Sequence, residues 1–259
     1  MTGLPDEIQI GRDGAVRIVT LSRPEVLNAT NASLHRGLAL VWRELSLDPD
    51  ACAVVLTGAG SAFSAGGDFH FMTQLHEDTL FREQVMEEAR TILLDMIRFP
   101  LPIVAAVNGP AIGLGCSLAL SCDIVLLSER AHLADPHVAI GLVAGDGGAA
   151  LWPMLTSLLR AKEYLFTGDP IAPELAVQIG LANRVVPHAE LLPEALRLAQ
   201  RLARLPRKAL RDTKRALHAH VEKAVAGPLE IAIQAEIASL ASAEHAERVR
   251  RLIAKSRGE

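Results

Sequence analysis

The sequence has few aromatic residues, and this shortage narrows the kinds of surface that the protein can form. Aromatic residues make up 3% of the 259 residues, and Tyr164 is the one tyrosine. Half of the chain is hydrophobic, chiefly Ala, Leu, Ile and Val, which favours layered helices and buried strands over an aromatic-rich binding surface. Because half of the residues are apolar and only 22% are charged, a large core is expected and intrinsic disorder is not.

Cysteine is also scarce, and the three cysteines, Cys52, Cys116 and Cys122, follow no CxxC pattern. Their odd number and spacing disfavour a disulfide framework and a structural zinc site, so a reducing compartment fits better. Residues 1–12 contain no basic stretch followed by an apolar run, and no signal peptide is expected. These absences predict a cytoplasmic protein without a bound metal ion.

Charged residues are missing altogether from Phe99 to Cys122, a stretch long enough to span a membrane. The stretch contains many helix-breaking residues, among them Pro102, Asn108, Gly109, Pro110, Gly113 and Gly115. That density of breakers predicts a buried strand, a turn and a buried helix. No membrane span is therefore expected.

The net charge of −4 hides an asymmetry between the two ends of the chain. Residues 194–259 carry 14 Lys and Arg against 8 Asp and Glu, whereas residues 1–193 are strongly acidic. A basic C-terminal region indicates either contacts with an anionic ligand or the solvated faces of amphipathic helices. No other feature points to nucleic acid as a partner.

Hydrophobic periodicity predicts strands that alternate with helices over the first 191 residues. Strands are expected at 8–11, 15–21, 53–57, 103–107 and 124–127, and helices at about 31–47, at 79–98 and up to about 121. Beyond residue 191 only helices are expected, at 196–205, 207–221, 229–240 and 243–255, with breaks at Pro206 and at Gly227-Pro228. The pattern predicts an α/β core at residues 1–191 and a helical region at residues 192–259.

Two glycine-rich segments follow predicted strands and are the best candidates for a ligand site. They are Phe63-Ser64-Ala65-Gly66-Gly67-Asp68 and the segment from Asn108 to Ser117. Glycine lets a backbone approach a ligand closely, and the first N–H groups of the helix that follows are free to bind an anion or a polarised oxygen. A dinucleotide-binding fingerprint is excluded because Leu118 stands where Gly or Ala is needed, and the chain has no Gly-Lys-Ser/Thr motif.

Several motifs, in order and spacing, resemble the enoyl-CoA hydratase/isomerase (crotonase) family. They are Arg23-Pro24 with Asn28-Ala29, Ala65-Gly66-Gly67-Asp68, Ala106-Val107-Asn108-Gly109 leading into Gly113-x-Gly115-Cys116, Cys122-Asp123-Ile124, Thr167-Gly168-Asp169 and Gly180-Leu181-x-Asn183. The resemblance implies a crotonase-like spiral of ββα units and a C-terminal helical region that packs in a homotrimer or a dimer of trimers. It also implies an acyl-CoA thioester as the ligand, with no cofactor beyond the coenzyme A of the substrate.

The same resemblance implies which residues meet that ligand. The backbone N–H groups of Gly67 and Leu114 would form an oxyanion hole for the thioester oxygen, an electrostatic effect worth several kcal/mol. The basic C-terminal region gains a plausible role in contacts with the CoA phosphates. The residues expected around the substrate are Ala65, Gly66, Asp68, Phe69, Gly113 and Asn28.

The chain departs from the family pattern at the two glutamates with which hydratases handle water and a proton. By motif, Ser117 stands at the first position, and Asp135-Pro136-His137 places His137 at the second. A two-carboxylate hydration mechanism therefore does not transfer to this chain. Asp146 lies one residue away from the position at which dienoyl-CoA isomerases of this family carry a carboxylate base.

Three hypotheses remain open at this point. The first is a lyase or isomerase that forms a thioester enolate, with His137 and Asp146 transferring protons. The second is a thioesterase in which His137 activates Ser117 as the nucleophile. The third is a binding protein that keeps the CoA site, with Ser117, His137 and Asp146 in structural roles as a helix-filling residue, a hydrogen-bonded loop residue and a helix cap.

Overall fold

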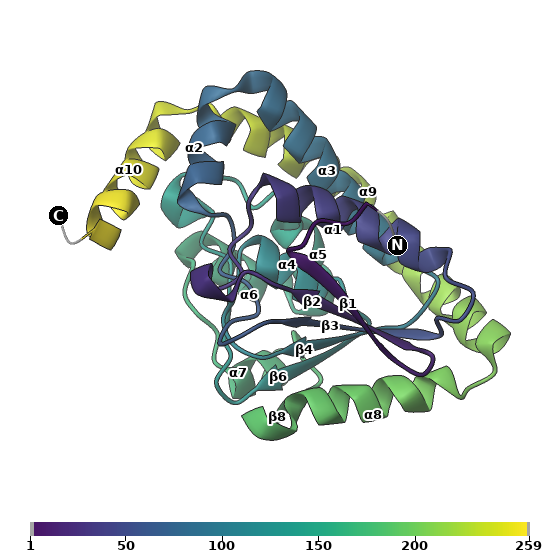
Figure 1. Cartoon of the computed structure of the whole chain (residues 1–259). Helices are drawn as coiled ribbons and strands as arrows, with labels where there is room; N and C mark the ends of the chain where they lie inside the picture. Colours follow the sequence, from purple (N-terminus) through teal and green to yellow (C-terminus); the bar gives the residue numbers. More distant parts are fainter. Residues whose placement is uncertain (1–2, 258–259) are drawn as a thin grey trace.

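A six-stranded sheet runs through the middle of the computed structural model, which describes residues 3–257 (Figure 1). The strand order is β1-β2-β3-β4-β6-β8, in which β1 and β2 form a hairpin and the other neighbours are parallel. A short parallel pair, β5 with β7, lies outside this sheet. The strands are β1 Ile8–Asp13, β2 Val16–Leu21, β3 Ala53–Gly58, β4 Ile103–Val107, β5 Ala111–Ile112, β6 Ile124–Ser128, β7 Leu133–Ala134 and β8 Arg184–Val186.

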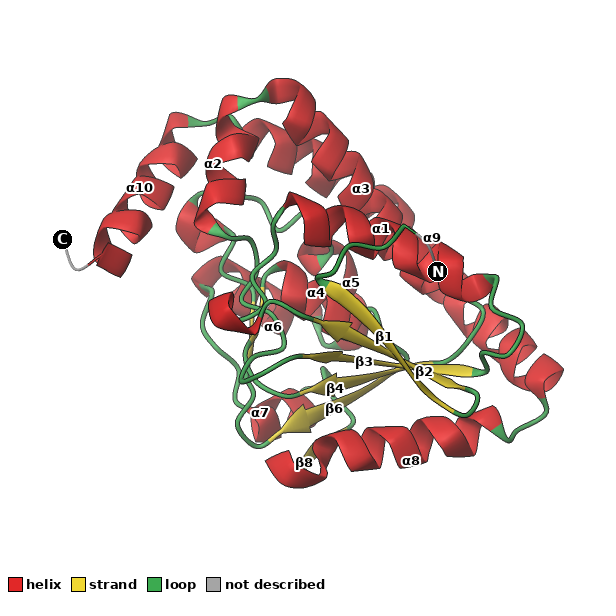
Figure 2. Cartoon of the chain, viewed as in Figure 1, coloured by secondary structure: helices red, strands yellow, loops and turns green. Residues whose placement is uncertain are grey.

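Helices cover both faces of the sheet, and the loops gather at the edge where β3, β4 and β6 end (Figure 2). The helix α8 lies along one face, while α1, α3 and α9 lie on the other side (Figure 1). The helices are α1 Ala32–Ser46, α2 Phe69–Glu77, α3 Thr79–Arg98, α4 Leu114–Leu120, α5 Gly148–Leu155, α6 Leu158–Thr167, α7 Pro173–Gln178, α8 Leu191–Ala203, α9 Arg207–Leu240 and α10 Ala243–Arg257. This α/β arrangement, with its helical C-terminal region, is the crotonase-like fold that the motifs predict.

Sequence pattern and packing agree closely in α1. Asn31 caps the helix by accepting a hydrogen bond from the backbone N–H of Leu34. The stripe that predicts the helix, Leu34, Leu38, Val41 and Leu45, is fully buried. It contributes to the larger of two apolar clusters, while the smaller cluster lies between the sheet and α8 and includes Val55, Val104 and Ala195 among its members.

The charge-free stretch from Phe99 to Cys122 is part of the protein core. It forms β4, the β5 strand and α4, whose side chains are almost all buried. Within residues 3–257, no single helix combines the length and apolar character of a membrane span, although the bent pair of α9 and α10 meets that test by length and composition alone.

The predicted helix break at Gly227-Pro228 is wrong, because α9 continues through both residues. Proline inside a helix removes one backbone hydrogen bond and crowds the preceding turn. Here Val225, Leu229 and Ile233 are buried against the core on either side of the break, and this packing outweighs the local penalty. The sequence pattern assigns no helix to α2, α6 or α7, all of which are short.

Candidate functional site

The two glycine-rich loops lie against each other at the carboxyl ends of β3 and β4. Ser64 and Ala111 form an isolated parallel bridge, and the backbone N–H of Ile112 donates to the carbonyl of Ser64 over 2.9 Å. A Cβ atom on Gly115 would lie 2.7 Å from that same carbonyl, so only glycine permits the contact. Gly113 has a φ of 54°, which also requires glycine and turns the chain into α4.

This contact brings together the two amides that the motifs predict as an oxyanion hole. Gly67 and Leu114 both line one cavity. Leu114 is the first residue of α4, so its N–H has no partner within the helix. Within residues 3–257, neither N–H donates a hydrogen bond to the protein, although the neighbouring Asp68 N–H donates to Thr30. Both amides are therefore free for a ligand oxygen.

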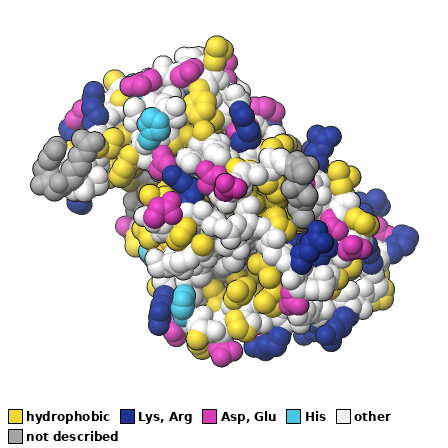
Figure 3. All heavy atoms as spheres, viewed as in Figure 1, with side chains coloured by type: hydrophobic (Ala, Val, Ile, Leu, Met, Phe, Trp, Pro, Cys, Tyr) yellow, Lys and Arg dark blue, Asp and Glu magenta, His cyan; other side chains and the backbone are white. Residues whose placement is uncertain are grey.

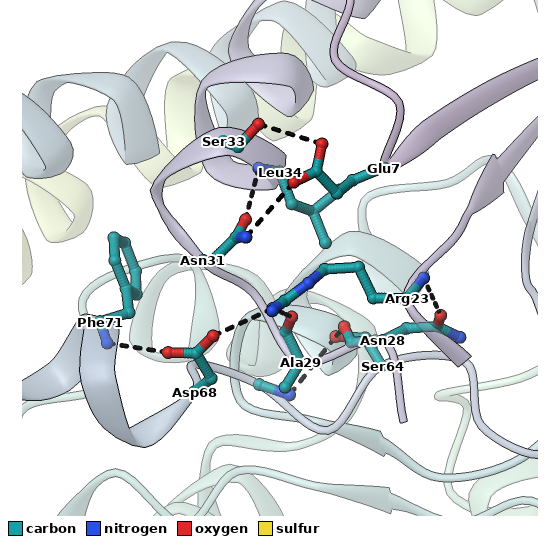
Figure 4. Close-up of polar contacts among 11 residues, drawn as sticks. Glu7, Arg23, Asn28, Ala29, Asn31, Ser33, Leu34, Ser64, Asp68 and Phe71 are labelled. Carbon is teal, nitrogen blue, oxygen red and sulfur yellow. Dashed lines mark hydrogen bonds and ion pairs between the residues drawn. The ribbon is translucent and has the colours of Figure 1, made fainter. Parts of the chain in front are cut away.

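Arg23 stabilises the loop that carries Gly67 through hydrogen bonds to Ala29 and Asp68 (Figure 4). The guanidinium of Arg23 donates to the Ala29 carbonyl and to Oδ2 of Asp68, the latter over 3.0 Å. The other carboxylate oxygen of Asp68 accepts the N–H of Phe71 and caps α2. Asp68 lines the cavity, as expected, yet most of its polar capacity is used by the loop.

Asn28, expected near the substrate, is instead a structural residue. It is fully buried and does not belong to the described lining of the cavity. Its Nδ2 donates to the carbonyls of Ala59 and Ala62. Its Oδ1 accepts the N–H of Arg23 (Figure 4). With both amide hydrogens and Oδ1 engaged inside the fold, Asn28 shapes the loop and does not face the cavity.

The cavity has a volume of about 500 Å³, which suits an acyl chain with its thioester. The expected substrate residues Ala65, Gly66, Phe69 and Gly113 line it. One wall is apolar and comes from α2 and α3, with Phe71, Met72, Leu75, Val85 and Met86. Leu252 of α10 also lines the cavity, so the last helix of the chain contributes to it.

At the polar end of the cavity, His137 lies among three carboxyl groups. Its Nδ1 forms a hydrogen-bonded ion pair with Asp135 Oδ1. Its Nε2 lies 3.5 Å from Asp146 Oδ2 and 3.9 Å from Glu236 Oε1. Asp135 is buried beneath the ring, whereas His137, Asp146 and Glu236 line the cavity. The structure thus brings His137 and Asp146 together, as the proton-transfer hypothesis requires.

Ser117 does not have the position that a nucleophile would need. Its hydroxyl donates to Asp146 Oδ1 over 3.1 Å and forms no hydrogen bond with His137 in the described residues. The residue is 2% exposed and lies outside the described lining of the cavity. The Ser117–His137 nucleophile–base pair is therefore not formed, and Ser117 instead orients the carboxylate of Asp146.

The charges in this cluster shift the pKa values in opposite directions. Burial alone would lower the pKa of His137, but the charges of Asp135 and Asp146 raise it well above its ordinary value. Burial opposes ionisation of Asp146, yet the charge of His137 and the hydrogen bonds from His137 and Ser117 leave its pKa below the usual value. Burial and the charge of Asp146 raise the pKa of Glu236 to about 8.

Glu236 is the functional candidate that sequence reasoning misses. It comes from the C-terminal end of α9, far along the chain from the glycine-rich loops. A signal does exist, because Leu229, Ala232, Ile233 and Leu240 form a buried stripe of that helix and Glu236 interrupts it. An acidic residue on an apolar stripe is unusual unless it is paired or functional.

A second missed group is His35, on the cavity-facing side of α1. It is 3% exposed and lines the cavity, and its Nδ1 lies 2.9 Å from Glu88 Oε2. Burial would raise the pKa of Glu88, but hydrogen bonds from His35 and Gln84 lower it. The cavity lining therefore includes the imidazole of His35, which Glu88 of α3 orients.

One atom each from Asp135, His137 and Asp146 lie within 4.8 Å of one another, a spacing that a divalent cation can bridge. These three side chains, however, already contact one another, because Nδ1 of His137 pairs with Asp135 and Nε2 of His137 lies against Asp146. We therefore expect dialysis against EDTA to leave activity unchanged. Activity that disappears with EDTA and returns with a divalent cation would contradict this expectation.

The buried carboxyl of Glu236 should make stability depend on pH. A carboxyl whose pKa is raised from 4.5 to about 8 in the folded state destabilises that state progressively as pH rises between these values. We expect Glu236→Gln to remove this effect. The free energy of unfolding of the variant, relative to the unchanged protein, should then increase by on the order of 2 kcal/mol from pH 5 to pH 7.

Urea unfolding at several pH values measures this difference directly. Glu230→Gln is a suitable control because Glu230 lies on the same helix but is half-exposed and pairs with Arg90. The control should show no comparable pH-dependent gain. A difference between Glu236→Gln and the unchanged protein that is constant with pH would mean that Glu236 is ionised in the folded state.

Comparisons with known proteins agree with this geometry. The family model described as enoyl-CoA hydratase/isomerase matches residues 11–254. A short-chain-enoyl-CoA hydratase of Clostridium acetobutylicum is 32% identical over 214 residues, covering 82% of this chain and 81% of that protein. A solved enoyl-CoA hydratase/isomerase from Mycobacterium paratuberculosis is 48% identical with a TM-score of 0.93, and the match covers 96% of this chain and 99% of that one.

A further solved relative is a β-diketone hydrolase from Anabaena sp. PCC 7120 bound to (S)-3-oxocyclohexyl acetic acid. It is 27% identical with a TM-score of 0.84, and the match covers 91% of this chain and 94% of that one. The family model spans nearly the whole chain, and two of the motifs that predict the family lie in the two glycine-rich loops that line the cavity. The chain belongs to the enoyl-CoA hydratase/isomerase family.

Proposed function

We propose that the protein is an acyl-CoA-processing enzyme, a lyase or isomerase, that stabilises a thioester enolate. The observation that carries the proposal is the arrangement within one cavity of two free backbone amides, Gly67 and Leu114, and a histidine held between carboxylates. Free amides favour negative charge on an oxygen, and a histidine that is strongly stabilised as a cation is a base suited to removing a proton from carbon.

The proposed chemistry begins with the thioester oxygen between the N–H groups of Gly67 and Leu114. His137, in its neutral form, takes a proton at Nε2 from the carbon next to the thioester carbonyl. The electron pair of the broken C–H bond moves into the carbonyl, and the two amides stabilise the resulting oxyanion. Asp135 and Asp146 stabilise the imidazolium, with Asp146 oriented by Ser117.

Coenzyme A is proposed to bind outside the cavity, near α10. Among the described residues that line the cavity, none is Lys or Arg. The helix α10 packs beside α2 (Figure 1) and carries Arg248, Arg250, Arg251 and Lys255 next to the cavity-lining Leu252. Elsewhere on the face shown in Figure 3, Lys and Arg are interspersed with Asp and Glu. Lys214, a basic residue of α9 in the same C-terminal region, is instead buried and donates a hydrogen bond to Asp123.

A homotrimer or a dimer of trimers is proposed as the assembly. Leu158, Leu159 and Phe166 of α6 are more than half exposed, which supports the presence of a partner surface there. Sedimentation velocity should give the mass of three or six chains of 27.7 kDa. A monomeric mass at micromolar concentration would contradict this assembly.

The proposed activity can be tested with a panel of acyl-CoA and enoyl-CoA esters in D2O. We expect deuterium to enter the carbon next to the carbonyl of at least one ester, because enolate formation exposes that position to exchange. Mass spectrometry of the recovered ester measures the uptake, and a thiol reagent measures released coenzyme A. Esters that bind without deuterium uptake or turnover would instead identify a binding protein.

Hydrolysis is the second candidate, and one observation favours it. A histidine flanked by Asp135 and Asp146 can also activate water, and a relative of the same fold is a β-diketone hydrolase. Incubation in H2(18)O separates the candidates, because hydrolysis places 18O in a carboxylic acid product. Label in such a product, from a thioester or from a β-diketone, would favour hydrolysis over the enolate reaction.

The pH dependence of kcat/KM should identify His137 as the base. Because the pKa of His137 is raised and its neutral form is needed, kcat/KM should increase with pH on the alkaline side of about 6.5. Asp146→Asn removes one of the charges that raise this pKa, so the rising limb should move to lower pH by on the order of one unit. A limb that stays in place in the variant would exclude His137 as the titrating base.

A further inference from the structure

His35 of α1 lies beside the apolar wall of the cavity, outside the group of ion pairs around His137. The residue is 3% exposed and lines the cavity, and its ring centroid lies 5.7 Å from that of Phe71. Within residues 3–257, Glu88 is the one carboxylate within 4.0 Å of its ring nitrogens. The imidazole of His35 is therefore separate from the proton-transfer groups that the proposed reaction uses.

The hydrogen bond to Glu88 determines which ring nitrogen of His35 is free. Burial would raise the pKa of Glu88, but hydrogen bonds from His35 and Gln84 lower it, so this carboxyl is ionised at neutral pH. An ionised carboxylate only accepts, so Nδ1 of His35 must carry a hydrogen and donate it over 2.9 Å. Gln84 and Arg36 contact the other carboxylate oxygen and keep Glu88 in place.

The second ring nitrogen of His35, Nε2, has no partner within the protein. It forms no hydrogen bond with the residues that the structure describes, and it is not among the polar atoms that are sealed inside the fold without one. It is therefore open to the cavity. An unpaired polar atom beside an apolar wall costs free energy, and the link to Glu88 does not require it. A hydrogen-bonding group on the ligand would account for this nitrogen.

The charges around the cavity restrict which ligand group suits Nε2 of His35. Asp146 and Glu88 are ionised, and no Lys or Arg belongs to the described lining, so a carboxylate on the ligand would be repelled. A ketone oxygen only accepts, so it would pair with Nε2 only when the ring is protonated. A hydroxyl both donates and accepts, so it pairs with Nε2 in either protonation state of the ring.

We propose that His35 is a specificity-determining residue whose Nε2 binds a hydroxyl group on the acyl chain of the substrate. The inference rests on the proposed acyl-CoA function and sharpens its substrate class. Because Gly67, Leu114 and His137 hold the reacting end of the thioester, a hydroxyl at His35 belongs to the part of the chain beyond the reacting carbons. The substrate class is therefore an acyl-CoA that is hydroxylated along its chain.

The test compares the dissociation constants of ω-hydroxyacyl-CoA esters with those of the matching unsubstituted esters, by isothermal titration calorimetry. Chain lengths of roughly six to nine carbons suit the cavity and place the hydroxyl at different depths. For at least one length, we expect the unchanged protein to bind the hydroxy ester more tightly, by up to roughly 10-fold. Matching esters that end in a carboxylate or carry a ketone should show no such preference.

Two conservative variants separate ligand recognition from support of the fold. His35→Asn places an amide near the position of Nδ1, so it can keep the bond to Glu88 but has no polar group at Nε2. His35→Gln places its amide near the position of Nε2. We expect the ratio of the two dissociation constants to shift by roughly 10-fold towards the unsubstituted ester in His35→Asn, and by less in His35→Gln. Unsubstituted esters should bind both variants within about threefold of the unchanged protein.

His132→Asn is the matched control, because His132 does not belong to the described cavity lining, and it should keep the preference for the hydroxy ester. A preference that survives in His35→Asn would overturn the proposal and leave His35 as a link between α1 and α3. Equal or tighter binding of the unsubstituted, ketone or carboxylate esters by the unchanged protein would overturn it as well. Absence of binding by every ester would instead contradict the proposed function, and the inference would fall with it.

Discussion

Replacing His137 by Asn should reduce turnover by roughly 10³-fold, the largest effect that we expect from a side-chain change, because a positioned acid–base group contributes 10²–10⁴-fold. Asn can keep a hydrogen bond to Asp135 but cannot accept and return a proton. The loss should fall on kcat and on α-carbon deuterium uptake alike. The dissociation constant of a saturated acyl-CoA should change little, since the cavity wall and both amides remain.

His132→Asn is the matched control for this variant. His132 lies five residues earlier, is partly exposed and does not belong to the described cavity lining. Its replacement should leave kcat unchanged. Full activity in His137→Asn would exclude His137 as the base and would direct attention to Asp146, whose carboxylate also lines the cavity.

The second large effect is expected from removing one amide of the oxyanion hole. Leu114 is the first residue of α4, a position where proline fits a helix without losing an internal hydrogen bond. Leu114→Pro removes the N–H at that point and should lower kcat by roughly 10²–10³-fold, as loss of one oxyanion donor does in other enzymes. The rate of α-carbon exchange should fall by a similar factor.

Leu114→Ala separates the amide from the side chain. It keeps the N–H and shortens a side chain that is 8% exposed in the cavity, so its effect should appear mainly in KM. Similar kcat values for the proline and alanine variants would remove the Leu114 N–H from the mechanism. Circular dichroism on both variants verifies that α4 and the rest of the fold are retained.

Local sequence signals predict much of the fold because they depend on neighbouring residues. The bounds of α3 and β4 agree with their predicted ranges, and Asn31 caps α1 at the predicted start. The helix break predicted at Gly227-Pro228 is wrong because it depends on residues that are distant in the sequence. Its effect on α9 is decided by packing of Val225 and Leu229 against distant elements, which no local pattern contains.

The residues of the candidate site also divide into those that local motifs predict and those that only the folded structure identifies. Gly67, Leu114, His137 and Asp146 lie near recognisable motifs, and the structure brings all four to one cavity. Asn28 belongs to a motif but supports a loop, and Ser117 has a hydroxyl that is engaged with Asp146. Glu236 reaches His137 only because α9 folds back over the loop after β7, so its partner is far away in sequence.

Deuterium uptake at the carbon next to the thioester carbonyl is the most direct test of the central claim. The measurement uses the panel of acyl-CoA and enoyl-CoA esters in D2O, with the unchanged protein beside His137→Asn and Leu114→Pro. We expect deuterium uptake with the unchanged protein. In both variants the rate of uptake should be lower by a factor of roughly 100 or more. Release of coenzyme A from a bound ester without uptake of deuterium would contradict the enolate mechanism.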